Sequence, residues 1–272
     1  MIDIGVSDLK SITKVIKEKY GYDFSNYAMS SFKRRIMRIL EINKISLDIL
    51  TERIINNSYT REQFLHEITV NVTEMFRDPS FWKVSRNLLS EMFSKRDKIK
   101  IWHAGCSSGE EVYSMLIMLH EMGGVDKVEI VASDIDKSIL SKAKEAKISS
   151  KNMEINIHNY QRFNGSAQLE KYFKIENDFW YFDKTLLQKV SFREIDLVKA
   201  IQFSKFDFVL CRNVLIYFNQ NLQNDVLKLL HGCIFEGGIL LIGNKESISG
   251  CEISSKFSLL NSEEKIFKKN KE

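Results

Sequence analysis

The sequence of 272 residues lacks several features that would assign it quickly to a class of protein. No stretch approaches the ~20 apolar residues that a membrane-spanning helix needs, and the opening segment MIDIGVSDLK lacks the basic-then-apolar pattern of a secretory signal. The four cysteines include no CxxC pair and the five histidines are scattered, so we expect reduced core thiols and no metal site. Together these absences predict a cytoplasmic protein.

A strong excess of one charge sign is also missing. Lys and Arg number 40 against 36 Asp and Glu, which gives a net charge of +4 and a pI near 8.7. This is mild for a nucleic-acid-binding domain, where a pI above about 9 with clustered basic residues is expected. We therefore expect no nucleic-acid partner and no direct membrane insertion, with a monomer as the default state.

Glycine and proline are almost absent from the first third of the chain. Between Ser7 and Leu89 only Gly21 and Pro79 occur, and apolar residues recur at helical spacing. This pattern predicts an all-helical N-terminal domain over residues 1–89, followed by a linker at residues 90–97.

From residue 98 to residue 272 short apolar strands alternate with amphipathic helices. Strands buried on both faces and separated by helices indicate a parallel sheet in an α/β domain. The predicted strands are Lys100–Ala104, Glu129–Ser133, Val190–Arg193, Phe206–Leu210 and Gly238–Gly243, and the predicted helices are Glu110–Met122, Lys137–Lys147 and Leu222–Ile234. The aromatic run Phe179–Phe182 suits a small β-hairpin inserted near residues 170–188, and Phe257–Lys268 suits a last antiparallel strand pair.

The segment IWHAGCSSGEE places small residues where the first strand of this domain turns into a helix. Ligands of doubly wound folds bind at such turns, where small residues let them approach the backbone. The segment is not GxGxxG, and Glu110 and Glu111 would repel a pyrophosphate. A ligand with a sulfonium and an ammonium group fits better. The alternative is a plain tight turn with acids that stabilise the start of the helix.

The second strand ends in the acidic segment SDID. An acid at this place commonly accepts hydrogen bonds from ribose hydroxyls. Asp134 is nearest the strand end and is our candidate for that role, whereas Asp136 suits the N-cap of the following helix.

Several motifs occur in a distinctive order along the chain. They are NVTEMFRDPSFW (71–82), AGCSSGEEVYS (104–114), ASDID (132–136), FDFVLCRNVLIYF (206–218) and GGILLIGNKES (237–247). Together they closely resemble the chemotaxis receptor glutamate methyltransferases, the CheR family, over residues 8 to 268. The resemblance implies an α/β fold with a Rossmann-like class I methyltransferase domain behind an all-α domain. It also implies methyl transfer from S-adenosylmethionine to glutamate carboxylates on the cytoplasmic helices of chemoreceptors, with S-adenosylhomocysteine as product.

The resemblance also implies a set of cofactor-binding residues. The set comprises Asn71, Thr73, Arg77, Ala104, Gly105, Glu111, Asp134, Asp196, Leu197, Arg212 and Asn213. Within it, Glu111 matches a contact to the amino-acid portion and Asp134 a contact to the ribose. Asp196 and Leu197 match positions near the adenine, although family members often have asparagine in place of Asp196.

Two residues are implied to be catalytic, Arg77 and Tyr217. The glutamate acceptor has a pKa of about 4.3 and is ionised at neutral pH, so no general base is needed. Arg77 would orient a carboxylate and Tyr217 would hold the methyl-transfer geometry. The alternatives are a surface ion pair for Arg77, plain core for Tyr217, and helix capping for Asn71 and Thr73.

The second predicted helix carries a basic cluster of Lys33, Arg34, Arg35 and Arg38. By resemblance this helix docks the glutamate-rich receptor; the alternative is a solvated helix face. The insertion at Tyr172–Leu187 lacks the glycine-bearing loop of members that bind a receptor C-terminal peptide, which favours action without that tether. Two other functions stay open: a related carboxyl methyltransferase acting on another protein or a small acid, and a non-catalytic cofactor-binding regulatory module.

Overall fold

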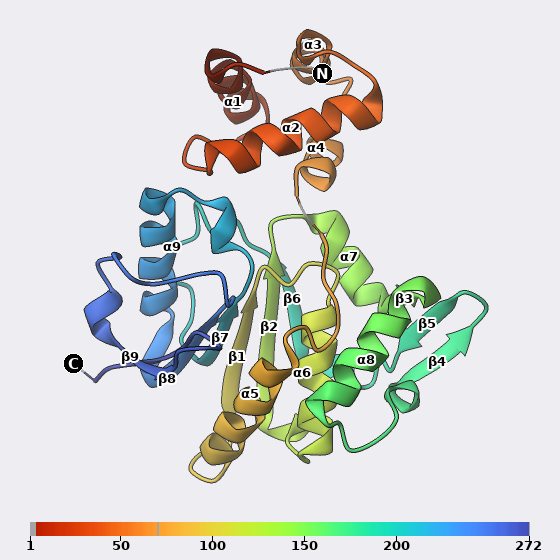
Figure 1. The fold of residues 1–272 in the computed structure, drawn as a ribbon, viewed down its shortest axis with the longest axis vertical. Helices are drawn as coiled ribbons and strands as arrows, with labels where there is room; N and C mark the ends of the chain where they lie inside the picture. The colour runs from red at the N-terminus through yellow and green to blue at the C-terminus, as the bar shows by residue number, and fades with distance from the viewer. Residues whose placement is uncertain (1–3, 70, 272) are drawn as a thin grey trace.

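The computed structural model describes residues 4–69 and 71–271, and it shows a helical domain above an α/β domain (Figure 1). The helices of the first domain are α1 (Val6–Tyr20), α2 (Met29–Asn43), α3 (Leu47–Ile55) and α4 (Arg61–Ile68). Their apolar faces form one core that includes Ile16, Ile36 and Phe64, each fully buried. The predicted all-helical N-terminal domain is therefore confirmed.

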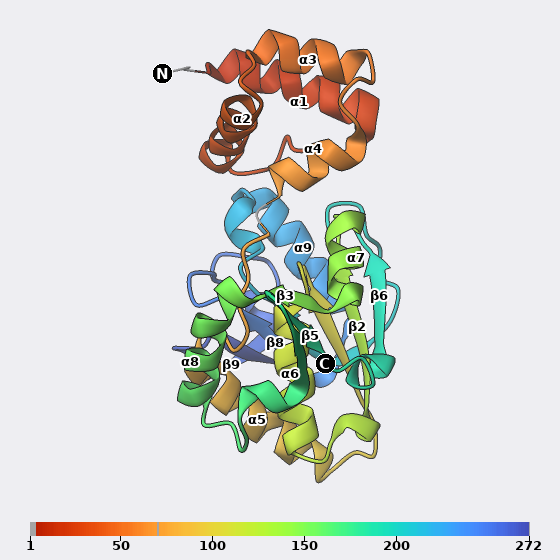
Figure 2. The same ribbon diagram turned by 90° about the vertical axis from the view of Figure 1, so that its right-hand side faces the viewer.

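Local signals in the sequence set the ends of these helices. Gly21 ends α1 in the left-handed conformation at φ 76°, which glycine adopts without strain. At the start of α4, the Thr60 hydroxyl accepts from the backbone N–H of Gln63 while the Gln63 side chain accepts from the N–H of Thr60. Helices α2 and α4 lie on the side of the helical domain that faces the α/β domain (Figures 1 and 2).

The fifth helix, α5 (Pro79–Phe93), belongs to the α/β domain. Its buried residues Phe81, Trp82 and Leu89 share a core with the α/β domain and not with α1 to α4. This moves the domain boundary from the predicted residue 89 to the end of α4, and the predicted linker at 90–97 overlaps the last turn of α5. Helical spacing shows that a helix has an apolar face but does not show which core that face joins.

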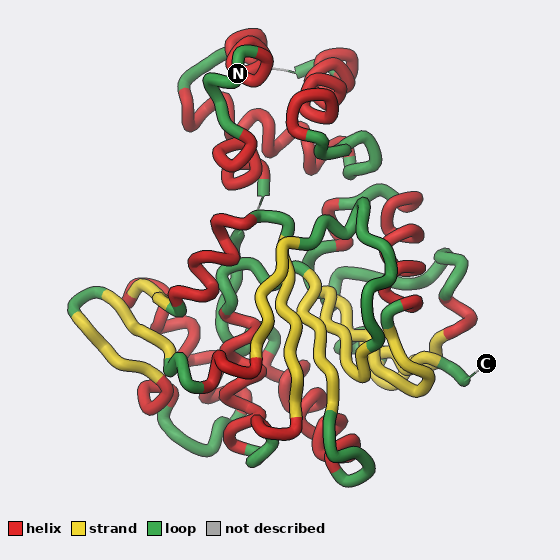
Figure 3. Tube along the Cα trace, turned by 180° about the vertical axis from the view of Figure 1, so that it is seen from behind, coloured by secondary structure: helices red, strands yellow, loops and turns green. Residues whose placement is uncertain are grey.

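The α/β domain is built on a mixed sheet with the order β6-β2-β1-β7-β8-β10-β9, seven strands among the described residues (Figure 3). Its strands are β1 (Ile99–Ala104), β2 (Val128–Asp134), β6 (Val190–Glu194), β7 (Phe206–Cys211), β8 (Ile234–Ile242), β9 (Phe257–Asn261) and β10 (Ile266–Lys269). Strands β6, β2, β1, β7 and β8 run parallel, and β10 is antiparallel to both of its neighbours. The predicted parallel sheet with an antiparallel last strand pair is confirmed.

The helices between these strands are α6 (Glu110–Glu121), α7 (Lys137–Glu145) and α9 (Gln220–Gly232). They lie within two residues of the predicted bounds. The start of α9 precedes the predicted one because the Asn219 side chain caps it, accepting from the backbone N–H of Leu222 at 3.0 Å.

The inserted β structure is larger than a hairpin. Strands β4 (Phe173–Glu176) and β5 (Phe179–Phe182) form the predicted hairpin, and β3 (Lys147–Ser149) adds a third strand on the other side of β5. Helix α8 (Met153–Phe163), which we did not predict, precedes the hairpin. Its buried face includes the asparagines Asn156 and Asn159, and these polar residues hide the apolar spacing.

Within the described ranges 4–69 and 71–271, no helix combines the length and the apolar character that crossing a membrane requires.

Candidate functional site

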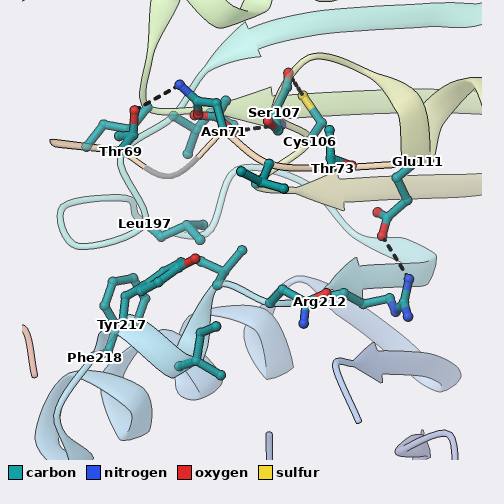
Figure 4. Close-up of a pocket in the computed structure, with 18 of the residues that line it drawn as sticks. Thr69, Asn71, Thr73, Cys106, Ser107, Glu111, Leu197, Arg212, Tyr217 and Phe218 are labelled. Carbon is teal, nitrogen blue, oxygen red and sulfur yellow. Dashed lines mark hydrogen bonds and ion pairs between the residues drawn. The ribbon is translucent and has the colours of Figure 1, made fainter. Parts of the chain in front are cut away.

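A cleft opens at the carboxyl ends of β1, β2, β6 and β7, beneath the helical domain. Figure 4 shows Asn71 and Thr73 on one side of it and Leu197 and Tyr217 on the other, with Glu111 and Arg212 at one end. The predicted cofactor-binding and catalytic residues that line the cleft are Asn71, Thr73, Arg77, Gly105, Glu111, Asp134, Asp196, Leu197, Arg212, Asn213 and Tyr217. Segments separated by more than a hundred residues in the chain therefore meet in one place.

Ala104 is the exception among the predicted cofactor residues. It is 2 % exposed and packs in the core on the α9 side of the sheet. Ala104 is the last residue of β1, and the cleft begins one residue later, at Gly105.

The loop after β1 needs glycine for two reasons at Gly105. Its φ is +85°, and a Cβ there would lie 2.5 Å from Cγ2 of Val214. The backbone N–H groups of Gly105 and Cys106 both donate to the carbonyl of Ser133, at 2.8 and 2.9 Å. The loop is thereby fixed against the end of β2, with Gly105, Cys106 and Ser107 lining the cleft.

The two acids after β2 have different tasks. Asp136 accepts from the backbone N–H groups of Ser138 and Ile139, at 2.8 and 3.3 Å, which confirms it as the N-cap of α7. Asp134 lines the cleft and accepts from the N–H of Ser107 at 2.9 Å. Burial raises the pKa of Asp134, although backbone hydrogen bonds from Asp136 and Ser107 oppose the shift.

A charge network, in which His103 and Arg212 are buried and Glu111 and Asp78 are half-buried, occupies one end of the cleft. The Glu111 carboxylate lies 2.8 Å from Nδ1 of His103 and 3.4 Å from Nη1 of Arg212. Nη2 of Arg212 donates to Asp78 at 2.6 Å, and the guanidinium stacks 3.8 Å from the ring centre of Phe81. Burial raises the pKa of Glu111, but His103 and Arg212 outweigh it, and the pKa lies below its usual value. Glu111 is therefore an anion at neutral pH.

The NVTEMFRD segment is held by side chains of α6 and α8. The backbone N–H of Met75 donates to Asn156 at 2.9 Å, and that of Phe76 donates to Ser114 at 2.8 Å. Asp78 and Pro79 begin α5, so neither Asn71 nor Thr73 caps that helix. Both line the cleft instead, which removes the capping alternative.

Arg77 lies on the same segment and also lines the cleft. Within residues 4–69 and 71–271 its guanidinium forms no ion pair, whereas its carbonyl accepts from Nε1 of Trp82 at 3.0 Å. The surface ion pair that we considered as the alternative is thus not formed by the described residues.

The other end of the cleft joins the two domains. Tyr217 lies in the loop after β7, and its carbonyl accepts from the N–H of Ala28 at 2.9 Å. Tyr27 pairs with Phe218 in an isolated β-bridge, with ring centres 5.0 Å apart. Tyr217 therefore sits at a domain contact, half-buried, with its ring facing the cleft.

Arg35 does not lie with the rest of the predicted docking cluster. Arg34 and Arg38 are exposed and Lys33 is half-buried, but Arg35 is 6 % exposed and lines the cleft. Its Cζ lies 3.8 Å from the ring centre of Tyr217. Among the described residues, its Nε and Nη2 atoms have no hydrogen-bond partner. On α2 a residue one position away from Arg34 faces a different direction, and spacing alone did not show which basic residue points inward.

Several lining residues were missed because nothing in their type marks them. Tyr27, Ile135, Ile195, Ile216 and Phe218 form apolar walls.

Glu246 was also missed, and it supports the cleft from behind. It is 5 % exposed and accepts from the backbone N–H groups of Asn213 and Ile216, at 3.1 and 3.2 Å. These bonds hold the loop after β7, where Asn213 adopts a positive φ of 61°. In the sequence, the feature that could have indicated this role is a single acidic residue, Glu246, shortly after the apolar run GGILLIG.

Fold and site together define a Rossmann-like methyltransferase whose catalytic domain follows an all-helical domain. Residues 71–266 match the family model described as CheR methyltransferase, SAM binding domain, and residues 7–69 match the one described as CheR methyltransferase, all-alpha domain. The chain belongs to the CheR methyltransferase family, and its α/β domain is the S-adenosylmethionine-binding domain.

Relatives match over nearly the whole chain. The Pseudomonas putida protein Cher3 is 36% identical over 264 residues, covering 97% of each chain. A Listeria innocua chemotaxis protein methyltransferase is 30% identical and covers 89% of this chain and 90% of its own. Chemotaxis protein methyltransferase 1 of Pseudomonas aeruginosa is 31% identical, with 82% of each chain covered.

Proposed function

We propose that this protein transfers a methyl group from S-adenosylmethionine to glutamate side-chain carboxylates of chemoreceptors, forming glutamate γ-methyl esters and S-adenosylhomocysteine. One observation carries the proposal: the cleft has the Glu111 carboxylate at one end and the Arg35 guanidinium, beside Tyr217, at the other, with Arg77 also in its lining. The first suits a cationic methyl donor and the second a carboxylate acceptor. The names of the relatives from Listeria innocua and Pseudomonas aeruginosa supply the chemotaxis context.

The donor end fits S-adenosylmethionine residue by residue. The Glu111 anion suits the ammonium group, and the Asp134 carboxylate at the end of β2 suits ribose hydroxyls. Leu197 and Ile135 offer apolar surface to an adenine. Gly105 lines the cleft without a side chain, so a ligand can approach the loop backbone there. Asn71, Thr73, Asp196, Arg212 and Asn213 would complete this set.

The acceptor end suits a carboxylate. Arg35 is buried with unpartnered N–H groups, and leaving such groups unpaired costs stability unless a ligand satisfies them. A guanidinium can grip a carboxylate with two parallel hydrogen bonds. We therefore assign Arg35 to the acceptor pocket, beside Tyr217, and not to the outer docking surface.

The mechanism relies on position and charge. When bound, the donor supplies an activated methyl group on a sulfonium, and the leaving thioether is neutral. Arg77 and Arg35 would hold the glutamate carboxylate, and the Tyr217 ring, stacked on Arg35, would fix its direction. No proton moves, because the acceptor is already ionised. Holding two reactants in line can contribute about 7–11 kcal/mol to the lowering of the barrier.

The exposed residues Arg34 and Arg38 lie one turn apart on α2, whose Arg35 enters the cleft. We propose that they attract the glutamate-rich receptor helices and deliver one glutamate to Arg35. Such a partner would place the enzyme in the cytoplasm.

The test is transfer of labelled methyl from S-adenosylmethionine to receptor-containing membranes, with Arg77→Ala as control. We expect base-labile label on the receptor bands with the native chain and strongly reduced label with Arg77→Ala. Label on another protein and none on receptors would instead support the related carboxyl methyltransferase. Cofactor binding without transfer to any target would support the regulatory module.

A further inference from the structure

We propose that His103 is a positioning residue: through one hydrogen bond it directs the Glu111 carboxylate toward the ammonium group of the methyl donor. The inference rests on the proposed function only in that Glu111 binds this ammonium group. His103 itself does not line the cleft. It acts through Glu111.

His103 occupies a position that otherwise suits an apolar residue. It is fully buried on β1, paired with Ala132 of β2 on one side and Leu210 of β7 on the other. Within the described part of the chain, its Nε2 has no hydrogen-bond partner. A buried ring nitrogen without a partner is costly, so the residue is not explained as a satisfied member of the core. The polar contact that its side chain makes is with Glu111.

That contact is the shorter of the two that hold Glu111. Nδ1 of His103 lies 2.8 Å from Oε1, whereas Nη1 of Arg212 lies 3.4 Å from Oε2. To bond the carboxylate, Nδ1 must carry the ring proton. Each carboxylate oxygen accepts two hydrogen bonds, so one acceptor position on each is left for a ligand.

Arg212 is a competitor for the same carboxylate. It is fixed by Asp78 at 2.6 Å and by the face of Phe81 at 3.8 Å, so it stays in place whether or not Glu111 pairs with it. Without His103, Glu111 would be free to turn fully toward Arg212. The anion would then be neutralised by a protein cation, and the donor ammonium would lose its partner.

Loss of His103 should weaken the binding of ligands that carry the amino-acid group and leave the binding of ligands without it nearly unchanged. Calorimetry on the full chain would compare S-adenosylhomocysteine with methylthioadenosine, which shares the adenosine and the thioether but lacks the ammonium and carboxylate. We expect His103→Leu to weaken S-adenosylhomocysteine binding roughly tenfold, the size of one hydrogen bond to a charged group. Methylthioadenosine binding should change less than about twofold.

Two further variants test the route of the effect. His103→Asn keeps an N–H near the position of Nδ1, so we expect it to restore S-adenosylhomocysteine binding to within about threefold of the native chain. In a Glu111→Gln background, His103→Leu should cause no further loss, because its target is gone.

Equal losses for both ligands with His103→Leu, or no loss for either, would overturn the proposal. Failure of His103→Asn to restore binding would also count against it, provided thermal denaturation shows a folded protein. None of these measurements uses a receptor. If the chain discriminates the two ligands as expected but labels no receptor, the proposed acceptor is wrong and the role of His103 stands.

Discussion

The two ends of the cleft differ in how their polar groups are satisfied. At the donor end, Glu111 and Asp134 already accept hydrogen bonds from the α/β domain alone. At the acceptor end, Arg35 comes from the helical domain, Tyr217 from the α/β domain, and the Arg35 guanidinium has unpartnered N–H groups among the described residues. In our proposal, the first end is preorganised for a small molecule that is the same in every turnover, and the second end binds a carboxylate that a macromolecular acceptor brings.

The largest expected effect is at the donor end. Glu111→Gln removes the anion but keeps the side-chain size, and we expect S-adenosylhomocysteine affinity to fall about a hundredfold, as for loss of a buried charge-assisted bond. The matched control is Glu110→Gln, because Glu110 is the adjacent acid, is buried, and lies outside the cleft. Calorimetry should show less than about a threefold change for that control. Similar losses in both variants would contradict the assignment.

The next effect belongs to the acceptor end. Arg35→Leu keeps an apolar stem against Tyr217 but removes the guanidinium, and we expect kcat for methyl transfer to fall at least about tenfold. S-adenosylhomocysteine affinity should stay within about twofold, because Arg35 is assigned to the acceptor alone. Arg34→Leu, an exposed neighbour on the same helix, is the control for kcat. If Arg35→Leu also lost cofactor affinity to a similar extent, Arg35 would not serve the acceptor alone, and the proposed difference between the donor end and the acceptor end would be wrong.

A substitution of Arg77 shows whether this residue belongs to the donor end or to the acceptor end of the cleft. Because it lines the cleft without an ion pair to the described residues, Arg77→Ala should lower kcat/KM by roughly tenfold or more. Steady-state kinetics would be combined with calorimetry to show which ligand it serves. Normal activity together with normal cofactor affinity would remove Arg77 from the site.

A smaller effect should come from the outer face of α2. Reversing Arg34 and Arg38 to Glu should raise KM for receptor several-fold and flatten its dependence on salt, while kcat changes little. The control pair Lys10→Glu and Lys14→Glu has the same spacing and is exposed on α1. If charge reversal at Lys10 and Lys14 raised KM as much as charge reversal at Arg34 and Arg38, the change in net charge would explain the effect and a docking surface on α2 would not be needed.

The smallest effect concerns the stability of the helical domain. Burial raises the pKa of Asp23, but hydrogen bonds from Lys17 and Ser25 outweigh it and lower the pKa from 3.8 to about 2. Because the pKa of Asp23 is lower in the folded than in the unfolded protein, its ionised form stabilises the folded state at pH values above 3.8. This contribution to the free energy of unfolding is lost as the pH falls from 3.8 to about 2. Since Lys17 is largely exposed, we expect Asp23→Asn to cost about 1 kcal/mol at pH 7. Denaturant unfolding would check this, and equal costs at pH 7 and pH 2 would refute it.

The sequence was most informative where a residue of a characteristic type stands at a characteristic position relative to a strand. Small residues after β1, acids after β2 and alternation of apolar segments were enough to predict the sheet and much of the donor end, including the cap at Asp136. The family motifs supplied further lining residues, such as Asn71, Arg77 and Arg212, but not the apolar walls of the cleft.

Features that depend on packing could not be predicted. Helix α8 was hidden by buried asparagines that bond the Met75 backbone. The membership of α5 in the α/β core, the inward direction of Arg35 and the support from Glu246 each depend on contacts between distant segments. No local pattern contains that information.

The most direct test of the central claim is tandem mass spectrometry of a receptor cytoplasmic fragment after incubation with S-adenosylmethionine and either the native chain or Arg35→Leu. We expect the native chain to place methyl groups on glutamate side chains, and base treatment to remove them. With Arg35→Leu we expect strongly reduced methylation, although both chains bind S-adenosylhomocysteine equally. Methyl groups on another residue type, or equal glutamate methylation by both chains, would contradict the central claim.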